Sequence, residues 1–213
     1  MKQLKANSEA RGKRYTALVA LVALILSFAP SIVRADVTED ESGVYLGLAL
    51  VGTSYHVDWD IPAFNIKEDG GGAQISVGYR FNPVFMLEVT AGGSKHKTSD
   101  TAIDAGVTSV QLFGYYRFLP GKSFRPYLKG GVAGYAVTLK YESANAQMTG
   151  GGIAFGTGFK CFLSRRFSLG VDLTHNMIRY DKAKFTLGQL SYESGADEHG
   201  RLTTLGITAG YSF

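Results

Sequence analysis

The sequence predicts an all-β fold, an eight-stranded antiparallel up-and-down β-barrel that crosses a membrane with its strands. Three observations predict it: amphipathic segments of about ten residues, regular alternation of short and long connections, and enrichment in glycine and aromatic residues. The 213-residue chain holds 27 glycines, 12 tyrosines and 13 phenylalanines, but only 5 prolines and one cysteine. Glycine suits the crowded points of a closed sheet, and aromatic rings suit a lipid-facing surface. A cytoplasmic α/β enzyme matches this composition poorly.

The first 35 residues have the features of a cleaved export signal. A cationic stretch reaching Arg14 is followed by an apolar run from Tyr15 to Ala29, and Val33-Arg34-Ala35 provides a small-x-small cleavage site. The alternative is a membrane anchor, but this run is shorter than the roughly 20 residues that span a bilayer as a helix. We therefore expect residues 1–35 to be a signal peptide and residues 36–213 to be the barrel domain.

The basic balance of the chain belongs largely to that signal. The chain has 22 basic and 18 acidic side chains, a formal net charge of +4. Residues 1–35 contain six basic groups and one acid, which leaves 16 basic and 17 acidic side chains, or −1, for residues 36–213. The high isoelectric point is therefore no argument for a nucleic-acid partner, and we expect none.

Eight segments of the predicted barrel domain have the length of a tilted membrane-crossing strand. In residues 71–81 and 201–213, apolar and small or polar side chains alternate strictly, which is the period-two signature of a strand with one apolar face. No segment after residue 35 is long and apolar enough to be a transmembrane helix. The predicted strands are Gly43–Tyr55, Gly71–Phe81, Val84–Ser94, Val107–Phe118, Phe124–Leu139, Gly151–Phe162, Phe167–Tyr180 and Arg201–Phe213.

The connections predict the orientation of the barrel. Short links at 82–83, 119–123 and 163–166 alternate with long polar links at 56–70, 95–106, 140–150 and 181–200. Tight periplasmic turns and extended external loops give this alternation in an up-and-down barrel of the outer membrane. An even strand number places both ends of the domain on the side of the short turns.

Aromatic residues gather beside the short links, which predicts a girdle at the boundary between lipid and water. The alternative is a soluble barrel with aromatic rings inside, but its other face should then be charged along its length. Here that face carries mostly Gly, Ser, Thr and Gln. The predicted girdle comprises Tyr79, Phe81, Phe85, Tyr116, Phe118, Phe159, Phe162, Phe167, Tyr211 and Phe213.

Several runs resemble a known family. GGGAQISVGYRFNPVFMLEVTAGG resembles the second and third strands of the outer-membrane protein A transmembrane domain and its small relatives, with an Asn-Pro turn and a glutamate five residues after the proline. FRPYLKGGVAGY resembles the fifth strand of that family and of W-type barrels, GVYLGLAL the first strand and TAGYSF the last. The terminal Tyr211 and Phe213 resemble the assembly signal of outer-membrane proteins. The resemblance implies a small porin-family barrel, integral to the bacterial outer membrane and handled by its assembly machinery.

Six charged side chains are predicted to point into the barrel, all within a few residues of a short turn. Isolated buried charges are costly, so we expect them to pair in one network. In the family that this chain resembles, the counterpart of Glu88 belongs to an internal salt-bridge system that blocks the pore and is a candidate gate. The basic residues here do not align with the family's cationic partners, so a polar plug is favoured over a gate or narrow conduit. The six are Arg80, Glu88, Arg117, Lys129, Lys160 and Asp172.

The histidines raise a second alternative, a lipid-modifying enzyme. All four are predicted at the external end, and Ser99 and Asp100 closely follow His96. The chain lacks the His-x-Ser arrangement of lipid A deacylase barrels and the amphipathic N-terminal helix of the palmitoyl transferase. No spacing matches a metal ligand set, and we expect neither catalysis nor a cofactor. The four are His56, His96, His175 and His199.

The expected role is therefore structural, or an interaction through external loops, where Trp59 and Phe64 could contact a partner or the membrane surface. Expected partners are outer-membrane lipid with lipopolysaccharide, the assembly machinery and a possible extracellular molecule. We expect a monomer without a periplasmic peptidoglycan-binding domain. The first alternative is a narrow channel for small solutes, hydrophobic ones included.

Overall fold

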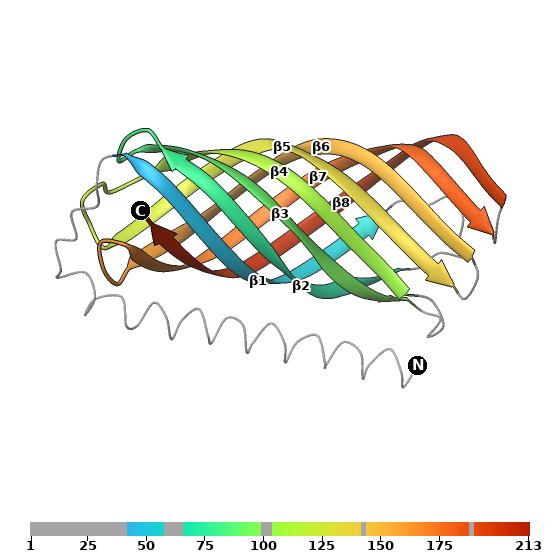
Figure 1. Cartoon of the computed structure of the whole chain (residues 1–213), viewed down its shortest axis with the longest axis horizontal. Coiled ribbons are helices and arrows are strands. Elements are labelled where there is room, and N and C mark those ends of the chain that lie inside the picture. The colour runs from blue at the N-terminus through green and yellow to red at the C-terminus, as the bar shows by residue number, and fades with distance from the viewer. Residues whose placement is uncertain (1–41, 58–65, 99–103, 142–143, 188–189) are drawn as a thin grey trace, which may run out of the picture.

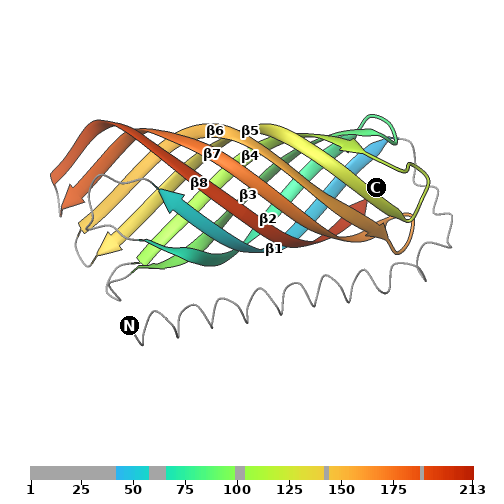
Figure 2. The same ribbon diagram turned by 180° about the vertical axis from the view of Figure 1, so that it is seen from behind.

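The eight strands of the chain close into one barrel, as Figures 1 and 2 show from opposite sides. The computed structural model describes residues 42–57, 66–98, 104–141, 144–187 and 190–213, and the predicted signal peptide lies outside them. Consecutive strands pair antiparallel and β8 pairs with β1, so the predicted fold class is confirmed. The strands are β1 (Gly43–Val57), β2 (Ile66–Arg80), β3 (Phe85–Thr98), β4 (Asp104–Arg117), β5 (Phe124–Tyr141), β6 (Ala144–Phe162), β7 (Phe167–Leu187) and β8 (Leu190–Ser212).

The pairing register determines the width of the barrel. Followed from Tyr45 through one partner on each strand, the pairing returns to β1 at Tyr55, ten residues further along. With ordinary strand spacing and rise, this stagger gives a tilt of about 40° and a wall radius of about 8 Å. Such an interior is just wide enough for side chains to fill.

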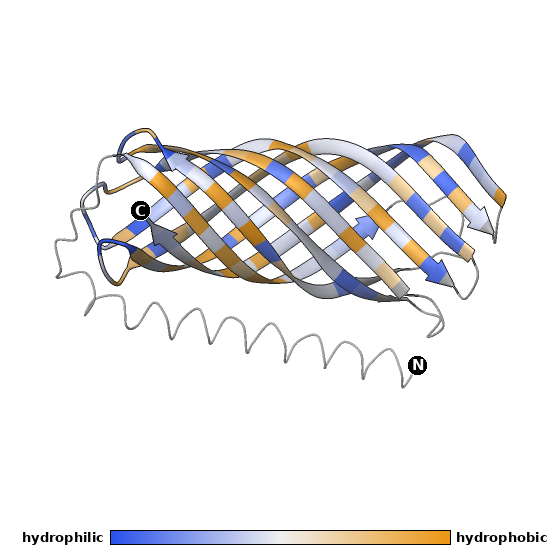
Figure 3. Cartoon of the chain, viewed as in Figure 1, coloured by the Kyte–Doolittle hydropathy of each residue, from blue (hydrophilic) through white to orange (hydrophobic). Residues whose placement is uncertain are grey.

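Side chains alternate between the outside and the interior along the strands. In β1, Leu46 and Leu48 are exposed on the outside, whereas Tyr45 and Gly47 are buried inside. Figure 3 shows apolar residues recurring along the barrel wall. A strand in lipid must present apolar side chains outward and pair its whole backbone, and a closed barrel satisfies both requirements.

The short turns form where the sequence places side chains that can accept backbone hydrogen bonds. The Asn82 Oδ1 accepts hydrogen bonds from the amides of Val84 and Phe85, both at 2.8 Å. Ser164 accepts one from the Phe167 amide at 3.1 Å in the turn between β6 and β7. These local bonds compensate for ladder hydrogen bonds that end at the turn.

The predicted girdle is present with one correction. Phe85 packs edge-on against Tyr116 at 5.4 Å between ring centroids, and Tyr211 packs against Phe213 at 5.0 Å. Phe162, in contrast, is buried inside the barrel. The prediction was wrong at this residue because Phe162 lies two positions from the inward Lys160 and therefore shares its face.

Two of the predicted external loops are largely strand. Residues 140–150 and 181–200 were expected to be loops, but β5 extends to Tyr141, β6 begins at Ala144, β7 extends to Leu187 and β8 begins at Leu190. Outside lipid both faces of a strand can be polar, so the apolar alternation that identified the strands is no longer required there. The β7–β8 hairpin protrudes beyond the other strands at the end opposite the short turns (Figure 2).

Candidate functional site in the barrel interior

A buried ion pair joins β5 to β7 across the lumen. The Lys129 Nζ lies 2.8 Å from an Asp172 carboxylate oxygen, and both side chains are almost fully buried. The same carboxylate accepts hydrogen bonds from the hydroxyls of Tyr127 at 2.7 Å and Thr174 at 2.6 Å. The aromatic ring of Phe113 lies 4.3 Å from the ammonium. Three donors and one ring thus replace the water that these charges lose.

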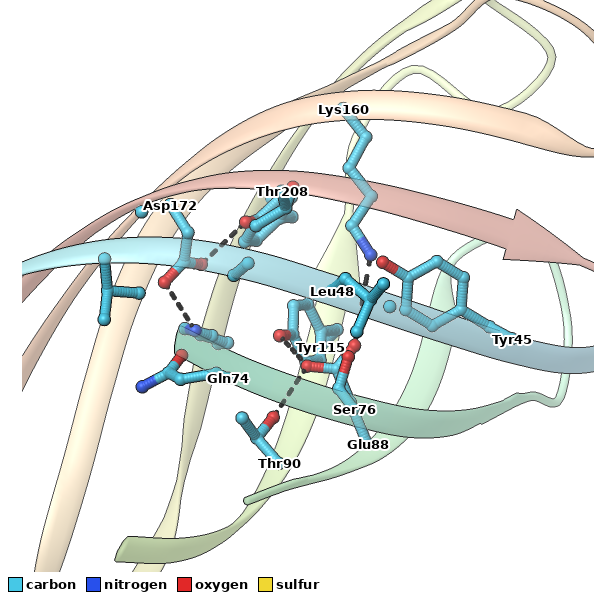
Figure 4. A pocket seen from close by; sticks show the side chains of 16 residues that line it. Tyr45, Leu48, Gln74, Ser76, Glu88, Thr90, Tyr115, Lys160, Asp172 and Thr208 are labelled. Atoms are coloured by element: carbon cyan, nitrogen blue, oxygen red, sulfur yellow. Dashed lines mark hydrogen bonds and ion pairs between the residues drawn. The ribbon is translucent and has the colours of Figure 1, made fainter. Parts of the chain in front are cut away.

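A second carboxylate, Glu88, lies close by on β3 (Figure 4). It accepts hydrogen bonds from the hydroxyls of Tyr115 at 2.6 Å and Thr90 at 3.1 Å. Its ion pair with the Lys160 Nζ is looser, at 4.0 Å. That ammonium lies 3.8 Å from the centroid of the Tyr45 ring. Glu88 therefore depends more on hydroxyl donors than on its cation, and Lys160 depends strongly on an aromatic face.

The remaining two predicted charges belong to a different group. Arg80 and Arg117 are the last residues of β2 and β4, beside the short turns. Arg125 of β5 lies near them, so three positive charges are close together. Arg117 donates to the Asn82 carbonyl oxygen at 3.0 Å, and Arg125 donates to that of Lys122 at 2.7 Å. All six predicted side chains are buried inside the barrel. Lys129 and Lys160 pair with the two carboxylates, while Arg80 and Arg117 lie with Arg125 beside the short turns.

Arg125 was missed by the sequence prediction, although a signal was present. It has the same parity as Tyr127 and Lys129 on β5, so the rule that placed Lys129 inside places Arg125 inside as well. Its guanidinium lies 4.3 Å from the centroid of the Phe162 ring. Phe162 and Arg125 therefore both point inward and pack against each other.

The space left around the carboxylates is small. The cavity between Glu88, Asp172 and Gln74 measures about 30 Å³, which is room for only about one or two water molecules. On its external side the lumen is filled by an apolar cluster, in which the Tyr55 hydroxyl donates to that of Tyr180 at 2.9 Å. The cluster comprises Tyr55, Val107, Ala133, Tyr135, Val137, Met148, Ile178, Tyr180, Ala183 and Leu202.

The histidines do not form a common site. His96 is buried in the lumen, where its Nε2 lies 2.9 Å from the Ser94 hydroxyl and 3.2 Å from that of Thr53. His175 is half-buried on the outer face, with its Nδ1 3.0 Å from the Thr203 hydroxyl, and His199 is exposed on β8. The predicted candidates Ser99, Asp100, Trp59 and Phe64 lie outside the described residues.

The described residues contain neither a group of metal-ligating side chains nor a membrane-spanning helix. No three His, Cys, Asp or Glu side chains in that part of the chain lie close enough together to hold a metal ion. Nor does it contain a helix with the length and apolar character needed to cross a bilayer.

Comparison with known proteins identifies the family. The model of the outer membrane protein beta-barrel domain matches residues 17–213, which is most of the chain. The chain belongs to this family. It is an integral protein of the bacterial outer membrane. No protein of curated function has a significantly similar sequence.

Solved structures of outer-membrane β-barrels have the same fold. Neisserial surface protein A is 16% identical with a TM-score of 0.58, covering 82% of this chain and all of the other. OprG from Pseudomonas aeruginosa is also 16% identical with a TM-score of 0.58, covering 84% and 99%. The attachment invasion locus protein of Yersinia pestis, in complex with the heparin analogue sucrose octasulfate, is 13% identical with a TM-score of 0.51, covering 81% and 99%.

Proposed function

We propose that this outer-membrane barrel is a non-catalytic protein with a closed lumen, whose role is to hold an interaction surface outside the cell. The observation that carries the proposal is the filling of the lumen at successive levels. Arg80, Arg117 and Arg125 lie at the end with the short turns. The Glu88 and Asp172 carboxylates with their partners form the next level, and the apolar cluster fills the external part. Water and ions would have to displace all three to pass.

The external part of the barrel supports the second half of the proposal. The strands β5 to β8 continue beyond the predicted membrane-spanning segments and remain paired, so they form a rigid wall rather than loose loops. A barrel of the same fold, the attachment invasion locus protein, was solved with a heparin analogue, so this fold can present a ligand surface. We expect a monomer with lipopolysaccharide and other membrane lipid as its surroundings.

An enzymatic role is less well supported by the geometry. Ser94 and His96 form the hydrogen-bonded pair that a nucleophilic mechanism would need, but both side chains are buried in the lumen. A lipid substrate would approach from the outside of the barrel and would meet other side chains. Mass spectrometry of lipid A from cells with and without the protein tests this point, and a changed acyl pattern would contradict the proposal.

One observation favours a second candidate, a narrow gated channel. The Glu88–Lys160 contact, at 4.0 Å, is long for an ion pair and borders the small cavity. A rotation of either side chain would enlarge that cavity.

Conductance in planar lipid bilayers distinguishes the two. For a closed lumen we expect no stable openings from the wild-type chain. Stable openings that change in size or frequency in Glu88→Gln or Lys129→Met variants would support the channel and contradict the closed barrel.

A further inference from the structure

His175 is a histidine on the wall that faces lipid. It lies on the outer face of β7, and the exposed side chains of Leu173 and Met177 lie two residues to either side on the same face. Its cross-strand partner on β6 is Phe155, and the centroids of the two rings are 5.4 Å apart. Hydrocarbon offers no hydrogen bond to an imidazole, so ionisable side chains in such surroundings are rare and usually functional. This position favours a role in binding.

Hydroxyl groups on the next two strands continue the polar position of His175. Its Nδ1 lies 3.0 Å from the hydroxyl of Thr203 on β8. Thr203 pairs in turn with Ser54 on β1, which has the outward parity of Leu48 and Leu50. The bond to Thr203 uses one ring nitrogen and leaves Nε2 for a group outside the barrel. Three strands thus present a row of hydrogen-bonding side chains to the lipid.

A cation lies just external to this row. Arg201 is exposed on the outer face of β8 and pairs across the strands with Met177, which lies two residues external to His175. Arg201 and His175 are therefore diagonal neighbours, a spacing of about 7 to 8 Å that long side chains bridge. The next arginine outward, Arg179, is already paired with Asp197. Arg201 forms no ion pair with a side chain of the described residues, so its charge is available to an anion.

The order of these groups along the barrel matches the lipid of the external leaflet. The short turns of an outer-membrane barrel face the periplasm, so Arg201 and His175 lie towards the cell surface. In that leaflet the main lipid is lipopolysaccharide. Its lipid A part has phosphates on its sugars and amide, ester and hydroxyl groups at the heads of its acyl chains. A cation above a hydrogen-bonding row and apolar side chains around that row complement these groups in the same order.

We propose that the outer wall of β7, β8 and β1 binds one lipid A group of lipopolysaccharide. Arg201 binds a phosphate, and the Nε2 of His175 forms a hydrogen bond with an amide, ester or hydroxyl group at the head of an acyl chain. Phe155 and Leu173 contact the chain itself. The site lies on the outside of the barrel, so this inference goes beyond the proposed function and does not depend on a closed lumen.

Titration of the detergent-solubilised protein, freed of lipid, with one lipid at a time tests the proposal, and native mass spectrometry counts the bound copies. We expect one lipid A per barrel, retained under conditions that remove phosphatidylglycerol, which also carries a phosphate. Dephosphorylated lipid A should bind about tenfold more weakly, because the charge-assisted contact with Arg201 is lost. Equal retention of phosphatidylglycerol would overturn the proposal in favour of a phospholipid on the same wall.

A pair of charge substitutions locates the phosphate. Arg201→Gln should weaken binding of lipid A by about tenfold and should hardly change binding of the dephosphorylated lipid. Lys140→Gln is the matched control, because it removes an exposed cation from the outer face of β5 on another side of the barrel. It should leave binding of lipid A within about twofold. Equal losses in the two variants would mean general attraction of an anionic lipid and would overturn the site.

The histidine is tested by His175→Leu, which suits a wall that faces hydrocarbon and should fold, as heat-dependent gel mobility will show. It should weaken lipid A and its dephosphorylated form alike, by about fivefold, because this hydrogen bond does not involve the phosphate. Unchanged affinity would overturn the role of His175. Bilayer conductance separates the remaining failures. A silent barrel that does not bind lipid A refutes this site alone, and a conducting barrel that binds it refutes the closed lumen alone.

Discussion

The Lys129–Asp172 pair allows a quantitative prediction of stability. Asp172→Asn removes the negative charge, keeps the shape and leaves the Lys129 ammonium buried beside Phe113. Two unit charges at the observed 2.8 Å attract by about 6 kcal/mol at an effective dielectric constant of about 20. Removing the carboxylate charge also removes its own desolvation cost, which offsets about half of that attraction, so we expect the free energy of unfolding to fall by about 3 kcal/mol. The reverse variant, Lys129→Met, should cost less because Tyr127 and Thr174 still donate to the carboxylate.

Reversible urea unfolding of the barrel in phospholipid vesicles is the assay. The double variant Lys129→Met/Asp172→Leu replaces both charges and should recover most of the loss, because no unpaired charge remains. Lys184→Gln is the matched control: it breaks an exposed ion pair with Glu193 and should change stability by less than about 0.5 kcal/mol. If Asp172→Asn were as mild as this control, the buried pair would not hold the interior together.

Three further predictions concern the wall and its assembly. Glu88→Ala should lower the midpoint of thermal unfolding in detergent, because it leaves the Lys160 ammonium buried without its carboxylate. An unchanged midpoint would show that Glu88 and its partners do not stabilise the barrel. Gly131→Ala should destabilise the barrel by at least about 1 kcal/mol, since a Cβ there would overlap the Leu112 carbonyl oxygen. The matched control Gly134→Ala places its Cβ in open space and should be neutral in the same unfolding assay. Deletion of Phe213 should lower the fraction of protein inserted in the outer membrane, measured by fractionation and heat-dependent gel mobility, and full insertion would show that the C-terminal ring is not part of the assembly signal.

The strands were predictable where lipid restricts the sequence. Leu46, Leu48 and Leu50 alternate with small or aromatic inward residues because the outward side chains face hydrocarbon. Beyond the lipid this restriction ends, and so did the accuracy of the prediction. The β7–β8 hairpin continues as far as Leu187 and Leu190 with polar side chains on its outer face, and a polar stretch of that kind is typical of loops.

The sequence predicted which side chains point into the barrel but not which of them pair with one another. Parity along each strand placed Glu88 and Asp172 inside, because successive side chains point to opposite faces. Partners depend on how residues far apart in the chain come together around the barrel. Lys129 meets Asp172 two strands away, although 43 residues separate them in the sequence. The omission of Arg125 was avoidable, since the same parity applied to it.

The contact between β1 and β8 has a consequence for how the protein can form. Tyr45 lies beside Ser212, so the seam joins the two ends of the domain. Until β8 is in place, β1 has unsatisfied amides and carbonyls on one side, and hydrocarbon offers nothing to bind them. Partly inserted intermediates are therefore costly, and insertion should be close to all-or-none. A chain truncated before β8 should accumulate on the periplasmic side as a substrate for proteases instead of a smaller barrel.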